Sequence, residues 1–427
     1  MSTFVIEGGT PLTGSVLIPG NKNAVLPAMA ASLLTDKEVV LENVPRIRDV
    51  DTMSKLIQGL GVVTNGVNTR GIKIRADNLK NNQPDDQLVT DLRASILLMG
   101  PLVAKFGKVT IRHPGGDIIG LRSIDEHLKA FSKLGAKITQ DGLMLTLAAE
   151  KVHGARIHLS EASVTATENI MMAAVTAEGE TVITNAACEP HVMCLGRMLT
   201  AMGANISGMG TNTINIIGVK SLGGCVHRIR PDHIEIGTWM IAAAATGGEI
   251  TVHGAFLEDL APMLVVLEPM GVKIEEIHCH EHHQDGVSCF KASRGKLTAY
   301  PHIHSNVWPG FPTDLMSPTI VLATQCTGTT LAHDWMYEGR MFFVDRLIKM
   351  GANIIVADPH RVIINGPTSL SARHTSSPDI RAGVALVIAS IIAKGTSQID
   401  MAEIIDRGYE QLEERLVKLG TNITRTA

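Results

Sequence analysis

Four short polar segments interrupt a chain rich in small apolar residues, and each holds side chains that bind charge or move protons. The first is Gly20-Asn21-Lys22-Asn23, which directly precedes the apolar run of residues 24–34. Such a run predicts a buried helix, and a lysine at a helix N-terminus opposes the helix dipole unless an anion lies beside it. Lys22 and Asn23 are therefore candidates for an anion site. The alternative is a solvated turn lysine.

The second segment, residues 112–122 (RHPGGDIIGLR), combines three glycines, a proline and one carboxylate, Asp117, with Arg122 at its far end. This composition predicts a mobile lid loop that brings Asp117 onto a ligand. An ordinary surface turn has a similar composition and is the alternative. The glycines do not follow the GxGxxG pattern, so we exclude a dinucleotide site here.

The third segment is Phe311-Pro312-Thr313-Asp314, and its aspartate comes directly before an uncharged run. Burial beside an apolar helix raises the pKa of a carboxyl group, which is what a general base working near neutral pH needs. A helix N-cap or first-turn acid is the alternative for Asp314, and the sequence leaves both open.

The fourth segment, residues 405–410 (IDRGYE), contains Arg407. A related pattern, Asp379-Ile380-Arg381, echoes Asp91-Leu92-Arg93 in the other half of the chain. Planar guanidinium groups bind carboxylates and phosphates through paired hydrogen bonds, so these arginines are candidates for anion recognition. Salt bridges between elements are the alternative.

A histidine-rich segment, residues 278–283 (HCHEHH), offers ligand types that suit zinc. It falls where the repeat described next requires a hairpin turn, so we favour a histidine-rich surface loop. We predict neither a metal nor an organic cofactor for this protein.

A repeated signature shows which elements position the four segments. A short pattern that begins with Leu-Gly or Met-Gly recurs six times, at intervals of 68 to 80 residues. Each copy follows an amphipathic pattern, so its glycine is predicted to end a helix in the left-handed conformation before a short strand. The glycines are Gly61, Gly135, Gly203, Gly271, Gly351 and Gly420.

Each repeat also contains a second run that is rich in small apolar residues and poor in charge, such as those beginning at Asn23, Arg93 and Ile380. A helix that is apolar on all sides has to be buried on all sides. The pattern predicts an α/β fold of β-α-β-α-β-β units, with buried helices inside and strands and amphipathic helices outside. The run from Leu315 to His333 is predicted to be a core helix and strand rather than a membrane span.

The composition limits the classes of function. The chain has 427 residues, of which 45% are hydrophobic and 19% charged, with a formal net charge of −4. This balance fits two domains of about 200 residues and gives no overall positive field for nucleic acid or an anionic membrane. The N-terminus lacks a signal-peptide pattern and the six cysteines form no CxxC pair, so we predict a cytoplasmic protein without a disulfide framework. The sequence leaves the oligomeric state open.

In combination, the four segments resemble the UDP-N-acetylglucosamine 1-carboxyvinyltransferase family of enolpyruvyl transferases. They occur in one order and at one spacing, and the resemblance extends over essentially the whole chain. It implies two inverted, barrel-like α/β domains of three repeats each, with the active site in the cleft between them. One domain would comprise residues 1–21 and 230–427, and the other residues 22–229 with the lid loop 112–122.

The resemblance implies a reaction that moves the enolpyruvyl group of phosphoenolpyruvate onto the 3-hydroxyl of UDP-N-acetylglucosamine. Addition and then elimination would release phosphate, at the first committed step of peptidoglycan precursor synthesis. By resemblance, Lys22, Arg122 and Arg407 bind phosphoenolpyruvate, Asn23 steadies the tetrahedral adduct, and Asp314 takes the proton from the sugar hydroxyl. Catalytic roles are thus expected for Asp117, Asp314, Lys22, Asn23 and Arg407.

The resemblance also implies a set of residues that bind the nucleotide sugar. Arg340 falls in the same sugar-lining segment as two of them, and Asp379 matches a further aspartate of the family's site. The expected ligands of the nucleotide sugar are Arg93, Arg122, Ser123, Ile124, Asp125, Glu126, Ser163, Val164, Asp314, Met336 and Glu338.

The chain departs from the family pattern at four positions. Many members have cysteine at the loop tip where this chain has Asp117, so the general acid would be a carboxylic acid with a raised pKa. Fosfomycin alkylates that cysteine, and we therefore predict insensitivity to it. Glu161 and Thr165 stand where relatives often have lysine and glycine beside the diphosphate, and His233 replaces an arginine that often follows the equivalent of Asp232.

Two other functions compete with this interpretation. A shikimate 3-phosphate enolpyruvyl transferase shares the fold, but the asparagine after Lys22, the Pro-Gly-Gly loop and the Asp-Arg-Gly-Tyr pattern favour the nucleotide-sugar enzyme. A non-catalytic paralogue that senses UDP-N-acetylglucosamine would be expected to lose charged site residues, whereas Lys22, Asp314 and Arg407 all remain.

Overall fold

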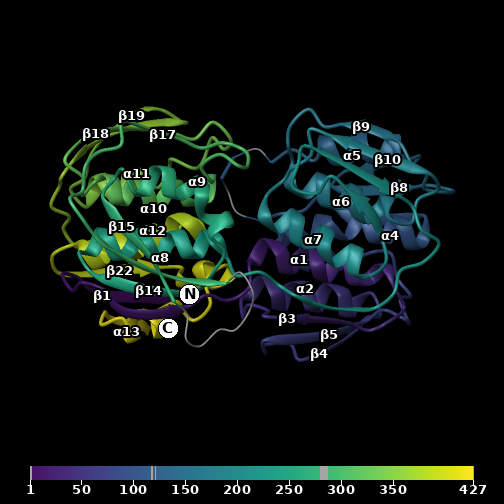
Figure 1. Ribbon diagram of the computed structural model, residues 1–427, viewed down its shortest axis with the longest axis horizontal. Coiled ribbons are helices and arrows are strands. Elements are labelled where there is room, and N and C mark those ends of the chain that lie inside the picture. Colours follow the sequence, from purple (N-terminus) through teal and green to yellow (C-terminus); the bar gives the residue numbers. More distant parts are fainter. Residues whose placement is uncertain (1, 117–118, 121, 279–286, 427) are drawn as a thin grey trace. The chain divides into compact units, whose positions relative to one another are not determined.

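The computed structural model describes residues 2–116, 119–120, 122–278 and 287–426. The chain forms two compact units (Figure 1). Unit 1 consists of Met1–Ile18, Asp117–Leu121 and Pro231–Ala427, and unit 2 of Pro19–Gly116 and Arg122–Arg230. Each unit has its own hydrophobic core.

Unit 2 contains, among the described residues, three small sheets of three or four strands. Short strands of alternating buried and exposed residues form them, as expected for sheets with one face on a core. In spatial order the strands are β13 (Cys225–Arg228), β3 (Val39–Glu42), β5 (Gly71–Arg75) and β4 (Val63–Asn65); β6 (Lys108–Arg112), β8 (Met144–Ala148) and β7 (Lys137–Asp141); and β11 (Asn205–Ser207), β12 (Thr213–Ile217), β10 (Glu180–Thr184) and β9 (Arg156–His158).

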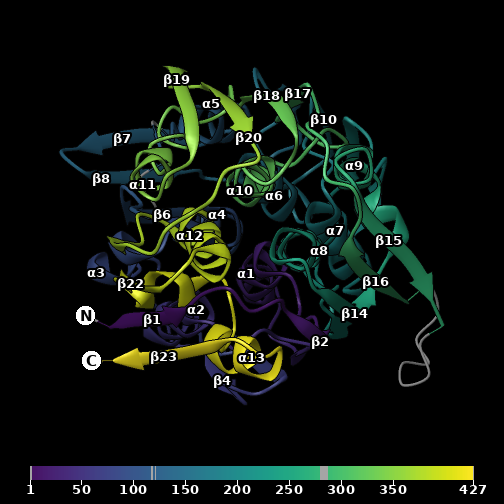
Figure 2. The same ribbon diagram turned by 90° about the vertical axis from the view of Figure 1, so that its left-hand side faces the viewer.

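Unit 1 likewise contains three four-stranded sheets in its described part, arranged around a group of central helices (Figure 2). In spatial order the strands are β21 (His374–Ser376), β22 (Thr396–Asp400), β1 (Thr3–Glu7) and β23 (Asn422–Thr426); β15 (Val272–Ile277), β16 (Ser288–Arg294), β14 (Glu249–Ala255) and β2 (Thr13–Leu17); and β17 (His302–His304), β18 (Gly328–His333), β20 (Arg361–Gly366) and β19 (Asn353–Asp358).

The apolar runs form the central helices, as predicted. In unit 1 these are α8 (His233–Thr246), α10 (Met316–Ala323) and α12 (Ile380–Ile392), which contact one another and are buried along almost their whole length. In unit 2 they are α1 (Lys22–Ala31), α4 (Met99–Phe106) and α6 (Val164–Ala174). The predicted core helix and strand between Leu315 and His333 are α10 and β18.

Amphipathic helices cover the outside of each unit, and six of them end at the repeated signature. The signature glycines all have a positive φ, between 91° and 105°, which confirms the predicted left-handed helix ends. These helices are α2 (Arg48–Gly59), α5 (Asp125–Lys133), α7 (Pro190–Ala201), α9 (Leu257–Leu267), α11 (Val344–Lys349) and α13 (Leu412–Lys418).

The remaining short helices connect these elements. They are α3 (Asp86–Asp91), η1 (Ser32–Leu34), η2 (Arg93–Leu98), η3 (Thr313–Leu315) and η4 (Ala402–Arg407). The order β9, α6, β10, α7, β11, β12 shows the predicted β-α-β-α-β-β unit in full, and the predicted α/β class is confirmed. No helix in the described part of the chain is long and apolar enough to cross a bilayer.

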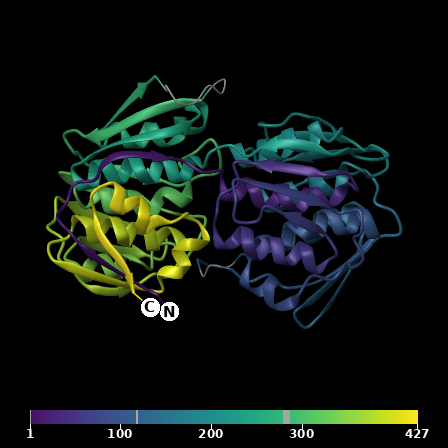
Figure 3. The same ribbon diagram turned by 90° about the horizontal axis from the view of Figure 1, so that it is seen from below.

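The first two strands complete sheets built by the C-terminal half of the chain. β1 is antiparallel to both β22 and β23 and lies between them, which brings the two chain ends close together (Figure 3). β2 pairs in parallel with β14. Residues 1–18 therefore supply strands that two sheets of unit 1 would otherwise lack.

Candidate active site

The predicted site residues fall into two groups, one in each unit. Unit 2 holds Lys22, Asn23, Arg93, Arg122 and the helix starts near Ser123 and Ser163. Unit 1 holds Asp314, Met336, Glu338 and Arg407. Asp117 lies outside the described residues, as does the histidine-rich segment after His278.

Lys22 begins helix α1 and forms an ion pair within its own unit. Its Nζ lies 2.8 Å from Oδ2 of Asp49, and the two side chains are only 13% and 4% exposed. The side chain of Asn21 caps the helix by accepting hydrogen bonds from the backbone N–H groups of Asn23 and Ala24, at 2.7 and 3.2 Å. Asp49 lies in the first turn of α2, where an acid is favourable, and its carboxylate partly balances the charge of Lys22 at the start of α1.

Arg93 forms hydrogen bonds with the backbone on both sides of the loop that carries Asp117. Its Nη1 donates to the carbonyl oxygen of Pro114 at 3.2 Å, and its Nη2 donates to the carbonyl oxygen of Arg122. A Cβ on Gly116 would lie 2.6 Å from Cβ of Arg93, so glycine is required for this close packing. Arg93, expected as a ligand of the nucleotide sugar, thus also positions the loop.

The predicted nucleotide segments form the N-termini of α5 and α6. The Oγ of Ser123 accepts a hydrogen bond from the backbone N–H of Asp125 at 2.9 Å, which holds the start of α5. Ser163 precedes α6, whose first residue is Val164. Helix N-termini favour anions because their first N–H groups lack partners within the helix. This arrangement suits phosphate groups.

Glu126 connects the two helix starts instead of facing solvent as a free ligand. Its Oε2 accepts from the backbone N–H of Ser160 at 2.6 Å, and its Oε1 accepts from Nζ of Lys129 at 2.9 Å. Burial raises the pKa of this carboxyl, but the hydrogen bonds from Lys129 and Ser160 outweigh it and the pKa is lowered. Glu126 is therefore charged at neutral pH and fixes α5 to the chain entering α6.

Thr165 is the hydrogen-bond partner of a buried histidine. Asn169 accepts from the backbone N–H of Gly100 through Oδ1 at 2.8 Å, so its Nδ2 donates to Nδ1 of His127 at 3.0 Å. The proton of the neutral ring is then on Nε2, which donates to Oγ1 of Thr165 at 3.0 Å. Burial, and secondly the charge of Arg93, lower the pKa of His127 to about 3. Thr165 thus satisfies a buried N–H group.

Glu161, the second departure in this region, is exposed. Its backbone carbonyl accepts from the N–H of Ser163 at 2.7 Å. The hydrogen bond and charge of Glu126, and to a lesser extent the charges of Asp125 and Glu161, raise the pKa of Lys129. Lys129 therefore offsets part of the negative charge that Glu161 adds beside α6.

In unit 1, two arginines hold the carboxylate of Asp314. Nη2 of Arg340 donates to Oδ1 at 3.1 Å, while Nε and Nη2 of Arg381 both lie 3.1 Å from Oδ2. The arginine side chains are 2% and 6% exposed, whereas that of Asp314 is 27% exposed. Two adjacent positive charges favour the ionised carboxylate. The position of Asp314 before the apolar helix α10 predicted an apolar environment, whereas its carboxylate lies between two arginines.

Arg381 is itself fixed by a buried tyrosine. Its Nη1 donates to the hydroxyl oxygen of Tyr409 at 3.1 Å, and that hydroxyl lies 3.0 Å from Oγ1 of Thr238. Burial raises the pKa of Tyr409, so it stays a neutral phenol. The chain Thr238, Tyr409, Arg381, Asp314 therefore aims the guanidinium at the carboxylate.

Arg340 connects Asp314 to the segment that precedes Glu338. Burial lowers the pKa of Arg340, but the charges of Asp314, Asp379 and Asp334 outweigh it and the pKa is raised. Asp334, fully buried, accepts hydrogen bonds from the hydroxyl of Thr313 and from the backbone N–H of Met336. This network fixes η3, which carries Asp314, to residues 334–340.

The described residues of the lid segment lie on this same part of unit 1. The backbone N–H of Gly339 donates to the carbonyl oxygen of Ile119 at 2.8 Å, and Ile119 is buried. Gly120 has a φ of 132°, and a Cβ there would lie 2.2 Å from Oε2 of Glu338. The exposed Glu338 therefore lies directly against the lid segment.

The other two predicted residues of unit 1 lie at helix ends. Arg407 is the half-buried last residue of η4, and the adjacent Asp406 is held by Nη1 and Nη2 of Arg425 at 2.8 and 2.7 Å. Asp379 is buried and caps α12, accepting from the backbone N–H groups of Arg381 and Ala382 at 2.8 and 2.9 Å. Asp379 therefore orients the helix start that presents Arg381.

The sequence pointed to the charged residues themselves but did not show which side chains they contact. Arg340 and Arg381 were noticed but not assigned to Asp314, and Asp49 was not connected with Lys22. The one available signal was the repeated Asp-x-Arg pattern, which places Arg381 and Arg93 at equivalent points. His233, which replaces an arginine of the family pattern, is buried in α8. Its ring lies 5.8 Å from that of Trp308 in an edge-to-face contact.

Comparison with known proteins shows similarity along the whole chain. The family described as EPSP synthase (3-phosphoshikimate 1-carboxyvinyltransferase) matches residues 6–416. A UDP-N-acetylglucosamine 1-carboxyvinyltransferase from Borreliella burgdorferi is 45% identical over 100% of this chain and 99% of its own length. One from Bradyrhizobium diazoefficiens is also 45% identical, over 99% of this chain and 97% of its own.

Solved structures show the same fold at low identity. The enolpyruvyl transferase NikO from Streptomyces tendae has a TM-score of 0.88 and 22% identity, covering 100% of this chain and 99% of that one. An EPSP synthase from Acinetobacter baumannii has a TM-score of 0.78 and 18% identity, with 100% of both chains covered.

Proposed function

Because the chain belongs to the family of the UDP-N-acetylglucosamine 1-carboxyvinyltransferases, within the enolpyruvyl transferases, we propose that it transfers the enolpyruvyl group of phosphoenolpyruvate to the 3-hydroxyl of UDP-N-acetylglucosamine. The chain is accordingly a transferase. The observation that carries the choice of substrates is the 45% identity, over full length, to relatives of that name. The pathway role that follows is the first committed step of peptidoglycan precursor synthesis, in the cytoplasm.

The reaction has two steps, an addition with two proton transfers and an elimination with one. In the addition, the sugar oxygen bonds to C2 of phosphoenolpyruvate, a base takes the hydroxyl proton, and an acid protonates the methylene carbon. In the elimination, that carbon loses a proton, the C–O bond to phosphate breaks, and the enol double bond re-forms. Acid–base groups and anion-binding groups suffice for these steps, and no cofactor is needed.

We assign the base to Asp314 and the acid to Asp117. The two arginines at Asp314 support its role, because an ionised carboxylate accepts a proton and the guanidinium groups hold it in one orientation. Asp117 would have to be protonated before the addition, which needs a pKa raised by its surroundings. Asn23 would donate a hydrogen bond to the tetrahedral adduct.

Lys22, Arg122 and Arg407 would bind the phosphate and carboxylate of phosphoenolpyruvate. The pair between Lys22 and Asp49 supports this role, since it holds the ammonium group at the start of α1 before an anionic substrate arrives. The N-termini of α5 and α6 would receive the diphosphate of the nucleotide sugar, which the free N–H groups of helix starts favour. Arg93 would act through the loop whose two ends it holds, in addition to any contact with the nucleotide.

Two alternatives are separated by one experiment, which measures phosphate release from phosphoenolpyruvate with UDP-N-acetylglucosamine and, separately, with shikimate 3-phosphate. We expect release with the nucleotide sugar alone. Asp314→Asn and Asp117→Ala should each lower kcat by at least about a hundredfold, in line with loss of a general base or acid. Asp345→Asn, which removes an exposed aspartate paired with Lys349, is the matched control and should keep full activity.

Other outcomes would reassign the protein. Release with shikimate 3-phosphate alone would make it the sister transferase. Tight nucleotide-sugar binding with no release from either acceptor would make it a sensor, and Glu161 would then be the first residue to replace.

A further inference from the structure

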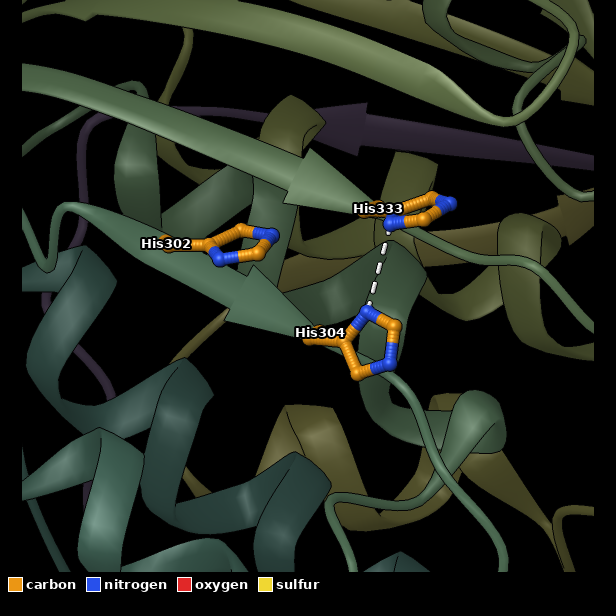
Figure 4. Close-up of side chains that lie close together, drawn as sticks. All are labelled: His302, His304 and His333. Atoms are coloured by element: carbon orange, nitrogen blue, oxygen red, sulfur yellow. Dashed lines mark hydrogen bonds between the residues drawn. The ribbon is translucent and has the colours of Figure 1, made fainter.

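Three histidines gather on one face of the sheet formed by β17, β18, β20 and β19 (Figure 4). β17 and β18 pair in parallel, with His304 opposite His333 in the register. His302 lies two residues before His304, and side chains two apart on a strand share a face. The strand register therefore brings three imidazole rings together, from residues up to 31 positions apart in the sequence.

The ring spacing is close to that of a metal site. Nδ1 of His304 lies 3.2 Å from Nδ1 of His333, and one nitrogen from each of the three rings lies within 4.8 Å of the others. Zinc binds histidine nitrogen at about 2.0–2.1 Å in tetrahedral geometry, which places neighbouring ligand nitrogens about 3.3 Å apart. The pair His304 and His333 already has this separation. The ring of His302 would need to approach by at most about 1.5 Å, within reach of a side-chain rotation because this residue is exposed.

We propose that His302, His304 and His333 form a binding site for a divalent transition metal of the zinc type, with water as the fourth ligand. Three neutral imidazoles are the ligand set that zinc, cobalt, nickel and copper accept and that calcium and magnesium do not. These three histidines are not part of the histidine-rich segment 278–283, for which the sequence analysis favoured a surface loop over a metal site.

The charges around the rings permit a cation. Arg361 on β20 is the register partner of His333, but its Nε and Nη2 bind Oδ2 of Asp358 at 2.7 and 2.6 Å. The positive charge of Arg361 beside the rings is therefore paired with a carboxylate.

A hydrogen bond between the rings is the simpler explanation of part of this geometry. With one Nδ1 protonated, His304 and His333 satisfy each other at 3.2 Å without any ion. That bond does not account for the third ring, whose centroid lies 5.7 Å from that of His304 and which stacks on His333 at 6.3 Å. Measurement of metal binding distinguishes the two.

A bound metal would join two segments that lead to Asp314. β17 ends at His304, from which the chain runs to η3, and β18 ends at His333, next to Asp334. Asp334 in turn accepts hydrogen bonds from the hydroxyl group of Thr313 and from the backbone N–H of Met336. A metal should therefore stabilise the ends of both strands. Any effect on turnover rests on the proposed function, whereas binding and stabilisation do not.

The test uses the full-length protein without a histidine tag, freed of metal with a chelator. Titration with Zn²⁺ followed by calorimetry should show one site, and Co²⁺ should give the visible absorption of a four-coordinate ion. Zn²⁺ should also raise the unfolding midpoint in a concentration-dependent way. His302→Asn, His304→Asn and His333→Asn should each weaken binding by more than about tenfold, because outer-shell changes alone cost 10–100-fold.

Two control proteins make the outcome decisive. His158→Asn removes an exposed histidine of β9, bonded to Oγ1 of Thr184, and should bind Zn²⁺ like the parent. A protein with His280, His282 and His283 all replaced by alanine should also keep the site. Loss of binding in that protein, or binding unchanged in every one of the three asparagine variants, overturns the proposal. His302→Asn alters an exposed edge-strand residue, so it tests the site even if His333→Asn folds poorly.

Discussion

Nε and Nη2 of Arg381 both lie 3.1 Å from the same oxygen of Asp314, although the two residues are 67 positions apart in the chain. Arg340 donates to the other oxygen. The carboxylate is thus held from both sides by buried positive charges. A base held in this way is oriented before the substrate binds.

Removal of one of these charges should slow the reaction. In Arg340→Met, Asp314 loses one of the two side chains that hold its carboxylate in place. We expect kcat/KM to fall by at least about tenfold, because a hydrogen bond to a charged group contributes about 1.5–3 kcal/mol. Arg361→Met, at an exposed arginine paired with Asp358, is the control and should keep full activity. Unchanged kinetics in Arg340→Met would contradict an orienting role of this arginine at Asp314.

Asp49→Asn should destabilise unit 2 and weaken phosphoenolpyruvate binding. The change removes the negative charge from one buried partner of the ammonium group of Lys22. We expect a loss of about 3 kcal/mol in the free energy of unfolding, the low end for breaking a buried pair, together with a raised KM for phosphoenolpyruvate. Urea denaturation and steady-state kinetics measure the two effects. Asp36→Asn breaks the exposed pair with Lys105 and should cost less than about 1 kcal/mol.

The buried His127 should make the protein sensitive to mild acid. Its pKa is about 3 in the folded state, against about 6.5 in the unfolded chain, so the unfolded state binds more protons between these values. The contribution of His127 to the free energy of unfolding is then fully present above pH 6.5 and falls by up to about 1.4 kcal/mol per pH unit on acidification. His127→Asn should reduce this slope between pH 6 and 4. Burial lowers the pKa of His227 to about 4 as well, so part of the slope should remain. An unchanged slope would show that His127 is not titrated on unfolding.

Fosfomycin should not inactivate the protein, because the loop position that it alkylates in many relatives is Asp117 here. Incubation of the purified enzyme with excess fosfomycin should leave both activity and intact mass unchanged. Asp117→Cys supplies a thiol at the same position and should acquire a covalent adduct, visible by mass spectrometry. Stoichiometric inactivation of the parent protein would refute the prediction.

Much of the fold follows from local patterns. The apolar run that begins at Ile380 forms a buried helix, and the glycine after each amphipathic helix adopts a positive φ, because both depend on residues close together in the sequence. The candidate residues were found for a related reason. Charged side chains such as Lys22 and Asp314 stand out at the ends of apolar helices.

The partners of those residues could not be predicted in the same way. Asp49 lies on a different helix from Lys22, and Arg340 and Arg381 reach Asp314 from separate segments. The sequence marks Thr165 only as a departure from the family's residue beside the diphosphate. In the structure its hydroxyl oxygen accepts a hydrogen bond from Nε2–H of His127. In each case the contacting residue is distant in the sequence, and no repeated sequence pattern connects it with the residue that it contacts.

The sequence by itself determined the repeat, which segments form buried helices, amphipathic helices or strands, and the types of side chain available for chemistry. Only the tertiary structure decided that β1 lies between β22 and β23, that two arginines meet at Asp314, and that His302 and His304 face His333. Helix and turn preferences act over a few residues, whereas sheet order and strand register depend on how distant segments pack. A local pattern therefore specifies an element and its ends, but the contacts that give a charged side chain its role are set by the fold as a whole.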